Sequence, residues 1–183
     1  CDLSQIKGIA YKVSTNDDSA YEETPFLKKE WFPPSTYSSY KTNPERPFIE
    51  DPDELPFPAR ELFPLPLYTS PGNVLMSRGG CPFRCRFCAV NNIWKGSRRF
   101  RKPEKVVEEI VHILKTGQAK EIAFADDIFT LNRGRVMELC ALLKDLKESL
   151  PLRWTCASRV DLVDKELLEK MREAGCYAIQ FGV

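Results

Sequence analysis

Prolines divide this chain into two stretches that cannot fold in the same way. Eleven of its fourteen prolines lie at or before Pro71. Proline lacks the amide hydrogen that helix interiors and inner strands need. Residues 14–72 are therefore predicted to be an extended, irregular linker, preceded by one short strand near residues 7–13. Aromatic side chains give the linker apolar surface with which to dock on a neighbour; they include Trp31, Phe32, Phe57, Phe63 and Tyr68.

Beyond the linker, apolar patterns with strand and helix periods alternate, beginning with the short apolar strand 74–77. Pro103 suits the first turn of a helix, Pro151 ends the next helix, and Asp164 caps a third. The order β-α-β-α-β-α-β predicts an α/β fold with a parallel sheet and right-handed crossovers. The later predicted elements are a helix at 103–116, a strand at 121–127, a helix at 132–150, a strand at 154–160, a helix from 164 to about 175 and a strand at 177–183.

The two faces of this predicted sheet differ in character. Ile122 and Phe124 point one way, whereas Ala123, Ala125 and Asp127 point the other. A parallel sheet covered on both faces is apolar on both. One bulky face and one small or polar face instead predict a partial (β/α) barrel, with helices outside and a ligand cavity inside. Four strands are about half of an eight-stranded barrel.

The chain does not begin with Met and stops within the last predicted strand, so we expect both ends to be cut. The expected organisation is residues 1–13 as the remnant of a preceding domain, 14–72 as the linker, and 73–183 as the N-terminal half of a barrel. The fourth strand would be an unpaired edge, and we expect the fragment alone to be inactive.

Charge and cysteine usage exclude several classes of protein. A net charge of +1 gives no bulk attraction to nucleic acid or to an anionic membrane. We find no apolar run of the roughly 20 residues that a membrane span needs, and no signal peptide. Seven cysteines, three of them clustered, do not resemble a secreted disulfide scaffold. We therefore expect a reducing, cytoplasmic compartment and a metal.

The clustered cysteines form the sequence Cys81-Pro82-Phe83-Arg84-Cys85-Arg86-Phe87-Cys88, within a long predicted loop at 79–101. Thiolates are soft ligands that suit zinc and iron–sulfur clusters. Three cysteines on a four-iron cube leave one iron open to a small molecule. The loop follows a strand at its carboxyl end, where parallel α/β folds place their active sites.

This pattern, with an aromatic residue before the third cysteine, resembles the signature of the radical S-adenosylmethionine (SAM) superfamily. The resemblance implies a 4Fe-4S cluster held by Cys81, Cys85 and Cys88. In that family the open iron binds SAM, whose reductive cleavage gives a 5′-deoxyadenosyl radical. It also implies that Phe87 lies near the adenine and that an electron donor such as flavodoxin or ferredoxin is the partner.

The superfamily carries a Gly-Gly-Glu-like segment after its second strand, which binds the methionyl amino group. Here that position reads Ala125-Asp126-Asp127. Its carboxylates could accept hydrogen bonds from an ammonium group, while the backbone contacts of the two glycines are not preserved. Arg159 and Gln180, on the predicted inner face, could reach the cofactor carboxylate or ribose.

A narrower resemblance joins residues 55–60, 77–85, 124–129 and 158–161 to the cobalamin-binding-domain subgroup. That subgroup includes methyltransferases of unactivated carbons and the anaerobic cyclase of chlorophyll biosynthesis. It implies methyl transfer or carbon-skeleton chemistry on a small-molecule or lipid substrate. Cobalamin would be bound by the preceding domain in the longer protein, and by none of these residues.

Other interpretations stay open. A non-catalytic, zinc-stabilised binding module would need a fourth ligand, with Cys140, Cys156, Cys176 and His112 as the candidates. A transfer-RNA methylthiotransferase shares the cysteine loop and a basic stretch like residues 95–102. The two aspartates could simply form a strand-end turn that caps the next helix. Arg159 could simply pair with Asp161.

Overall fold

The computed structural model describes residues 2–12, 40–63, 72–74, 77–116, 119 and 121–182. The chain divides into two units, Cys1–Ile49 and Glu50–Val183. In the first unit, β1 (Ala10–Lys12) pairs antiparallel with β2 (Tyr40–Thr42), after the short 3-10 helix η1 (Leu3–Gln5). The expected short strand near residues 7–13 is confirmed as β1. The roles of 1–13 as a domain remnant and of 14–72 as a linker stay predictions.

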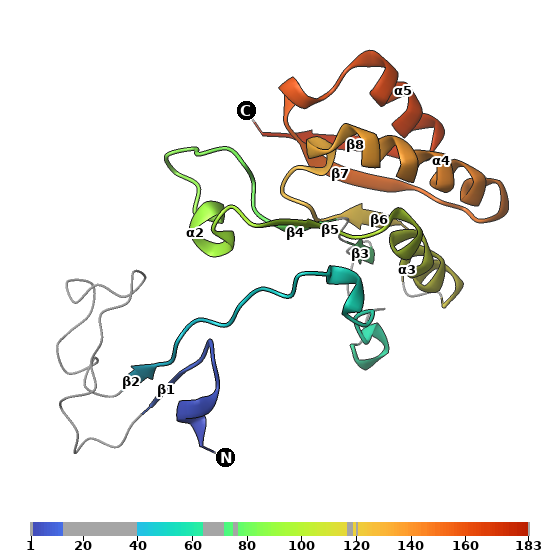
Figure 1. The fold of residues 1–183 in the computed structure, drawn as a ribbon. Helices are drawn as coiled ribbons and strands as arrows, with labels where there is room; N and C mark the ends of the chain where they lie inside the picture. The colour runs from blue at the N-terminus through green and yellow to red at the C-terminus, as the bar shows by residue number, and fades with distance from the viewer. Residues whose placement is uncertain are drawn as a thin grey trace. The chain divides into compact units, whose positions relative to one another are not determined.

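Four parallel strands form the sheet of the second unit, in the order β3-β6-β7-β8 (Figure 1). Because each strand pairs with the next one in parallel, all four carboxyl ends meet at one edge. The predicted α/β fold with a parallel sheet is therefore confirmed. The strands are β3 (Gly72–Val74), β6 (Ile122–Phe124), β7 (Trp154–Ser158) and β8 (Cys176–Phe181).

Three helices alternate with these strands: α3 (Pro103–Lys115), α4 (Arg133–Ser149) and α5 (Lys165–Glu173). Their starts follow from local chemistry. Pro103 occupies the first turn of α3. Asn132 accepts a hydrogen bond from the amide of Arg135 to cap α4, and Asp164 accepts one from Leu167 to cap α5. Each helix lies within a residue or two of its predicted range.

One hydrophobic core lies between the three helices and one face of the sheet. On β7, Trp154, Cys156 and Ser158 are buried, and the alternate residues between them are only half-buried. The Trp154 ring meets Phe124 edge-on at 5.1 Å between centroids, and Phe129 at 5.3 Å. Its indole nitrogen donates to the carbonyl of Ala174 at 2.9 Å. This confirms the predicted split between a bulky face and a small or polar one.

The segment around the cysteines has more structure than the sequence indicated. The predicted loop at 79–101 is wrong in part, because α2 (Val90–Trp94) and β5 (Arg98–Phe100) lie within it. Strand β5 pairs antiparallel with β4 (Ser77–Gly79), so the cysteines lie in the connection of a β-hairpin (Figure 1). Of the predicted strand at 74–77, Val74 lies in β3 and Ser77 lies in β4, while residues 75–76 are outside the described residues.

Short 3-10 turns complete the second unit: η3 (Pro52–Glu54), η4 (Arg60–Leu62), η6 (Phe129–Leu131) and η7 (Val160–Leu162). The predicted strand at 154–160 ends early because η7 follows it directly. Among the described residues, no helix has the length and apolar character needed to cross a membrane.

Candidate functional site

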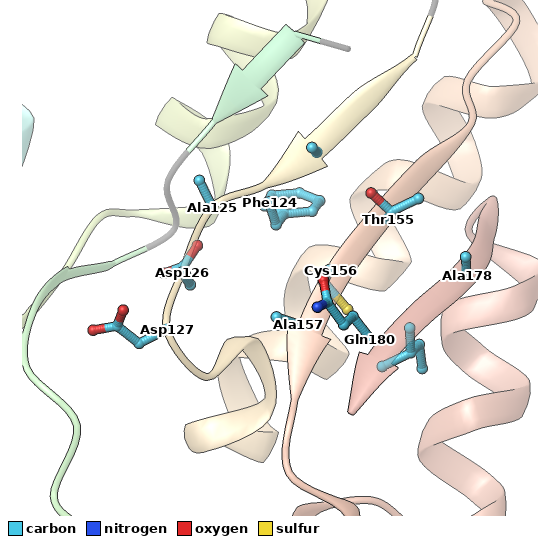
Figure 2. Close-up of a pocket in the computed structure, with 11 residues that line it drawn as sticks. Phe124, Ala125, Asp126, Asp127, Thr155, Cys156, Ala157, Ala178 and Gln180 are labelled. Atoms are coloured by element: carbon cyan, nitrogen blue, oxygen red, sulfur yellow. The ribbon is translucent and has the colours of Figure 1, made fainter. Parts of the chain in front are cut away.

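A pocket of about 670 Å³ opens on the sheet face that the helices leave uncovered (Figure 2). Three neighbouring strands and the turn after β6 contribute to its wall. Small side chains dominate, because the strand period turns their bulky neighbours toward the core. The lining residues are Ala123, Phe124, Ala125, Asp126, Asp127, Thr155, Cys156, Ala157, Ala178, Ile179 and Gln180.

Four of the predicted cofactor-binding residues lie together in this wall. Ala125, Asp126 and Asp127 follow β6, and Gln180 lies near the end of β8 (Figure 2). Their positions in the sequence, after β6 and near the end of β8, were enough to group them, because the carboxyl ends of parallel strands share one edge of the sheet. Their roles toward a cofactor stay predictions.

The two aspartates differ in environment. Asp126 is 4 % exposed, and its Oδ1 accepts hydrogen bonds from the backbone nitrogen of Ser77 at 2.6 Å and from its hydroxyl at 2.5 Å. This carboxylate therefore ties the end of β6 to the start of β4, which leads into the cysteines. Asp127 is exposed at the pocket wall. Of the two, Asp127 has the more accessible carboxylate for a ligand's ammonium group.

The three motif cysteines are free thiols, with Cys81 half-buried and Cys85 and Cys88 exposed. The amide of Cys88 donates to the carbonyl of Cys85 at 3.1 Å, and the amide of Phe83 donates to the Cys81 sulfur at 3.4 Å. Within the part of the chain that the structure describes, no three Cys, His, Asp or Glu residues are grouped so that they could hold a metal ion. As a donor set, three accessible thiols in one connection have the softness that an iron–sulfur cluster requires.

Of the four candidates for a fourth zinc ligand, three lie in or against the core and one lies on α3. Cys140 and Cys156 are buried in the core, and Cys176 packs against it. Burial raises the pKa of Cys140 to about 12. A hydrogen bond with Cys176, together with burial, raises the pKa of Cys156, and the same bond lowers the pKa of Cys176. His112, on α3, lies 6.3 Å from Phe57 between ring centroids.

Phe87 and Arg159 lie outside the pocket wall. The Phe87 side chain is 94 % exposed, next to the third cysteine. Arg159 follows β7 and forms a two-pronged ion pair with Asp161, at 3.0 and 2.8 Å. The ion pair with Asp161 that the sequence allowed is thus present, and cofactor contact by Arg159 stays a prediction.

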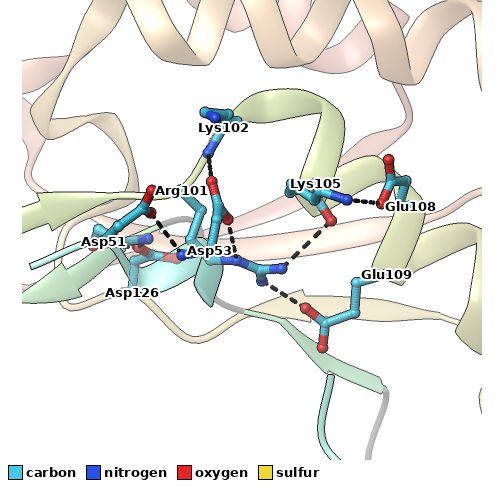
Figure 3. Close-up of polar contacts among 9 residues, drawn as sticks. Asp51, Asp53, Arg101, Lys102, Lys105, Glu108, Glu109 and Asp126 are labelled. Carbon is cyan, nitrogen blue, oxygen red and sulfur yellow. Dashed lines mark hydrogen bonds and ion pairs between the residues drawn. The ribbon is translucent and has the colours of Figure 1, made fainter. Parts of the chain in front are cut away.

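Sequence reasoning missed a buried ion-pair network that joins the residue after β5 to α3 and η3 (Figure 3). The Glu109 carboxylate, on α3, bridges Arg60 and Arg101 with 2.5 Å contacts to each. Arg101, directly after β5, also reaches Asp53 at 3.4 Å. The side chains of Arg60, Arg101 and Glu109 are 12, 8 and 3 % exposed. In the sequence, the sign of this network is Glu109, a charged residue among the apolar positions of the helix α3.

These features define a class: an α/β protein with a parallel sheet, an open pocket at the carboxyl ends of the strands, and a three-thiol connection beside it. The family model named Radical SAM superfamily matches residues 77–183. This chain belongs to the radical SAM superfamily.

Individual relatives agree with that membership. An uncharacterized methyltransferase of Pyrococcus horikoshii is 37 % identical over 154 residues, which cover 79 % of this chain and 33 % of the relative. The chain thus spans about a third of that protein's length.

Two solved structures share the fold. One is a cobalamin-dependent SAM radical enzyme, OxsB, with aqua-cobalamin and SAM bound (TM-score 0.58, 23 % identity, 79 % of this chain and 22 % of that one). The other is a radical SAM methyltransferase, TsrM, from Kitasatospora setae, with cobalamin and a 4Fe-4S cluster bound (TM-score 0.57, 21 % identity, 61 % and 20 %). Between them, the names of these two structures include the cluster, SAM and cobalamin that were predicted from the sequence.

Proposed function

We propose that Cys81, Cys85 and Cys88 hold a 4Fe-4S cluster and that the pocket beside them receives SAM. The observation that carries this proposal is that the three free thiols lie in one hairpin connection, whose Phe83 contacts Arg159 at the carboxyl end of β7. When bound, the cluster and SAM supply one-electron cleavage of the sulfonium and a 5′-deoxyadenosyl radical that abstracts hydrogen from a substrate.

The chain's own residues would bind and orient these groups. Asp127 offers an accessible carboxylate to the methionyl ammonium, while Asp126 holds β4 in place through Ser77. Gln180 offers an amide at the opposite side of the pocket. The alanines Ala125 and Ala157 leave room for a flat ligand against the sheet.

We propose that the reaction is cobalamin-associated methyl transfer. The name of the Pyrococcus relative and that of the structurally similar TsrM both support methyl transfer rather than methylthiolation of RNA. Carbon-skeleton chemistry like that of the anaerobic cyclase is the second candidate, because the motif resemblance at residues 55–60, 77–85, 124–129 and 158–161 is to a subgroup that includes both activities. Cobalamin would be bound elsewhere in the longer protein, the substrate would be a small molecule or lipid, and a flavodoxin or ferredoxin would supply the electron.

We further propose that the four strands are the N-terminal half of a barrel. The support is the one-sided helix layer, the pocket on the other face, and the position of β8 at the edge of the described sheet. On this proposal the present chain alone would not complete a turnover.

Cluster binding is tested by anaerobic reconstitution of the chain with iron and sulfide. We expect about four irons per chain, with an iron–sulfur absorption band and an electron paramagnetic resonance signal after reduction. Replacing Cys81, Cys85 or Cys88 by Ala should remove the iron. Cys176→Ala is the matched control, because this thiol packs against the core, and it should retain the iron.

One zinc per chain with no iron under these conditions would contradict the proposal and support the zinc-stabilised module. The reaction itself is tested in the longer protein, where reduction should produce 5′-deoxyadenosine from SAM. A methylated product that retains the label of isotopically labelled SAM methyl groups would distinguish methyl transfer from carbon-skeleton chemistry.

A further inference from the structure

Arg159 contacts the cysteine connection directly, across the sheet edge. Its guanidinium carbon lies 3.9 Å from the centroid of the Phe83 ring. At that distance a guanidinium stacks on an aromatic face by dispersion and by cation–π attraction. Asp161 accepts from Nε at 3.0 Å and from Nη2 at 2.8 Å, which fixes the orientation of the guanidinium plane.

Phe83 lies midway between the first two motif cysteines. Its amide donates to the Cys81 sulfur at 3.4 Å, and its carbonyl accepts from the Nδ2 of Asn91, on α2, at 2.7 Å. The backbone of Phe83 is thus tied to Cys81 and to α2, and its ring contacts the guanidinium of Arg159. The side chain that directly follows β7 therefore holds the segment whose shape decides where the Cys81 and Cys85 sulfurs point.

We propose that Arg159 is a positioning residue for the cluster: it clamps the Cys81–Cys85 segment through Phe83 and places a positive charge beside these two sulfurs. This inference rests on the proposed function. The hydrogen bond from Arg159 to Asp161 is the main cause that raises the pKa of Arg159, and the nearby Cys85 and Cys81 raise it further.

Two separable effects follow from this arrangement. The stack restrains the ligand segment, so its loss should speed the release of iron. The charge stabilises the more negative, reduced form of a nearby cluster, so its loss should lower the reduction potential. A role in packing alone would leave the potential unchanged.

Four variants of the reconstituted chain separate these effects. Arg159→Gln removes the charge and should lower the potential and speed chelator-driven iron release about 10-fold. Phe83→Leu removes the ring and should speed iron release with little change in potential. Arg159→Lys keeps the charge and should hold the potential close to that of the wild type. The matched control is Arg153→Gln, at the other end of β7, where Arg153 stacks on Tyr177 at 4.4 Å.

Amide hydrogen exchange in the metal-free chain adds a readout that needs no cluster. Exchange across residues 81–88 should rise in Arg159→Gln and stay unchanged in Arg153→Gln. Wild-type iron release, potential and exchange in both Arg159→Gln and Phe83→Leu would overturn the inference. A wild-type chain that takes up no iron, but whose exchange responds to Arg159→Gln, would refute the proposed function and still support the clamp.

Discussion

Replacing Glu109 by Gln should destabilise the second unit strongly. The Glu109 carboxylate is 3 % exposed and lies 2.5 Å from a nitrogen of Arg60 and 2.5 Å from one of Arg101. An amide has no charge to balance two largely buried guanidinium groups. Both would lose the carboxylate that lies 2.5 Å away, and Arg101 would keep its longer ion pair with Asp53. Removing one partner from a buried ion pair costs about 3–5 kcal/mol, a large part of the roughly 5–15 kcal/mol by which a domain is stable.

Urea unfolding of the full chain, followed by tryptophan fluorescence, measures this change, because Trp154 is buried in the affected unit. Glu108→Gln is the matched control, one residue earlier on the same helix. Glu108 pairs with Lys105 at 2.7 Å, but both side chains are about half exposed, at 54 and 47 %. Ion pairs of this exposure contribute little, so the control should unfold at nearly the wild-type urea concentration.

A triple variant tests the physical reason directly. Arg60→Met, Arg101→Met and Glu109→Leu together remove the three charges of the bridge and leave apolar groups of similar size. Asp53 would lose its ion pair with Arg101 but keep the hydrogen bond from the Lys102 amide at 2.7 Å. Replacing a buried ionic group in this way is often neutral or stabilising. Two results would show that the loss of stability does not come from buried charges left without a partner. One is a decrease of less than about 1 kcal/mol in the free energy of unfolding of Glu109→Gln, and the other is a triple variant that is less stable than Glu109→Gln.

Three further outcomes are expected. Gly80→Ala places a Cβ 2.9 Å from the Cβ of Trp94, which should shift α2 and reduce iron content after reconstitution, as measured by elemental analysis. In the folded metal-free chain, iodoacetamide should modify the motif thiols within minutes and Cys140 only on unfolding, because burial raises the pKa of Cys140 to about 12; mass spectrometry of the peptides checks this order. The hydrogen bond from the Leu167 amide lowers the pKa of Asp164 below its ordinary 3.8, so its contribution to stability is present above that value and is lost as the pH falls through the lowered pKa. Asp164→Asn should therefore show a smaller loss of urea resistance between about pH 5 and pH 2.

The sequence predicted best the features that depend on near neighbours. The helices α4 and α5 begin directly after Asn132 and Asp164, whose side chains accept the capping hydrogen bonds. Each bond spans only three residues, so the sequence nearby is enough to predict it. The alternation along β6 and β7 separated the alanines of the pocket wall from the bulky core residues for the same reason, although Phe124 and Cys156 contribute to both. Family membership followed from the eight residues that contain the three motif cysteines.

Features that depend on distant partners could not be predicted in this way. Arg60 and Glu109 are 49 positions apart, so no local pattern joins them. The contact between Arg159 and Phe83 likewise joins β7 to a hairpin connection. The helix α2 has five residues and no side-chain cap, and β5 is three residues long with two arginines, so neither shows a recognisable period.

The division of each strand between a small side and a bulky side has an evolutionary consequence. Ala123 and Ala157 face the chamber, whereas Phe124 and Trp154, one or three positions away, anchor the interior. Substitutions at the alanines can change the volume of the pocket in small steps. They leave the aromatic side chains of the core behind the sheet unchanged. Chains with this architecture can thus diverge in the shape of the chamber while their folding requirements stay constant.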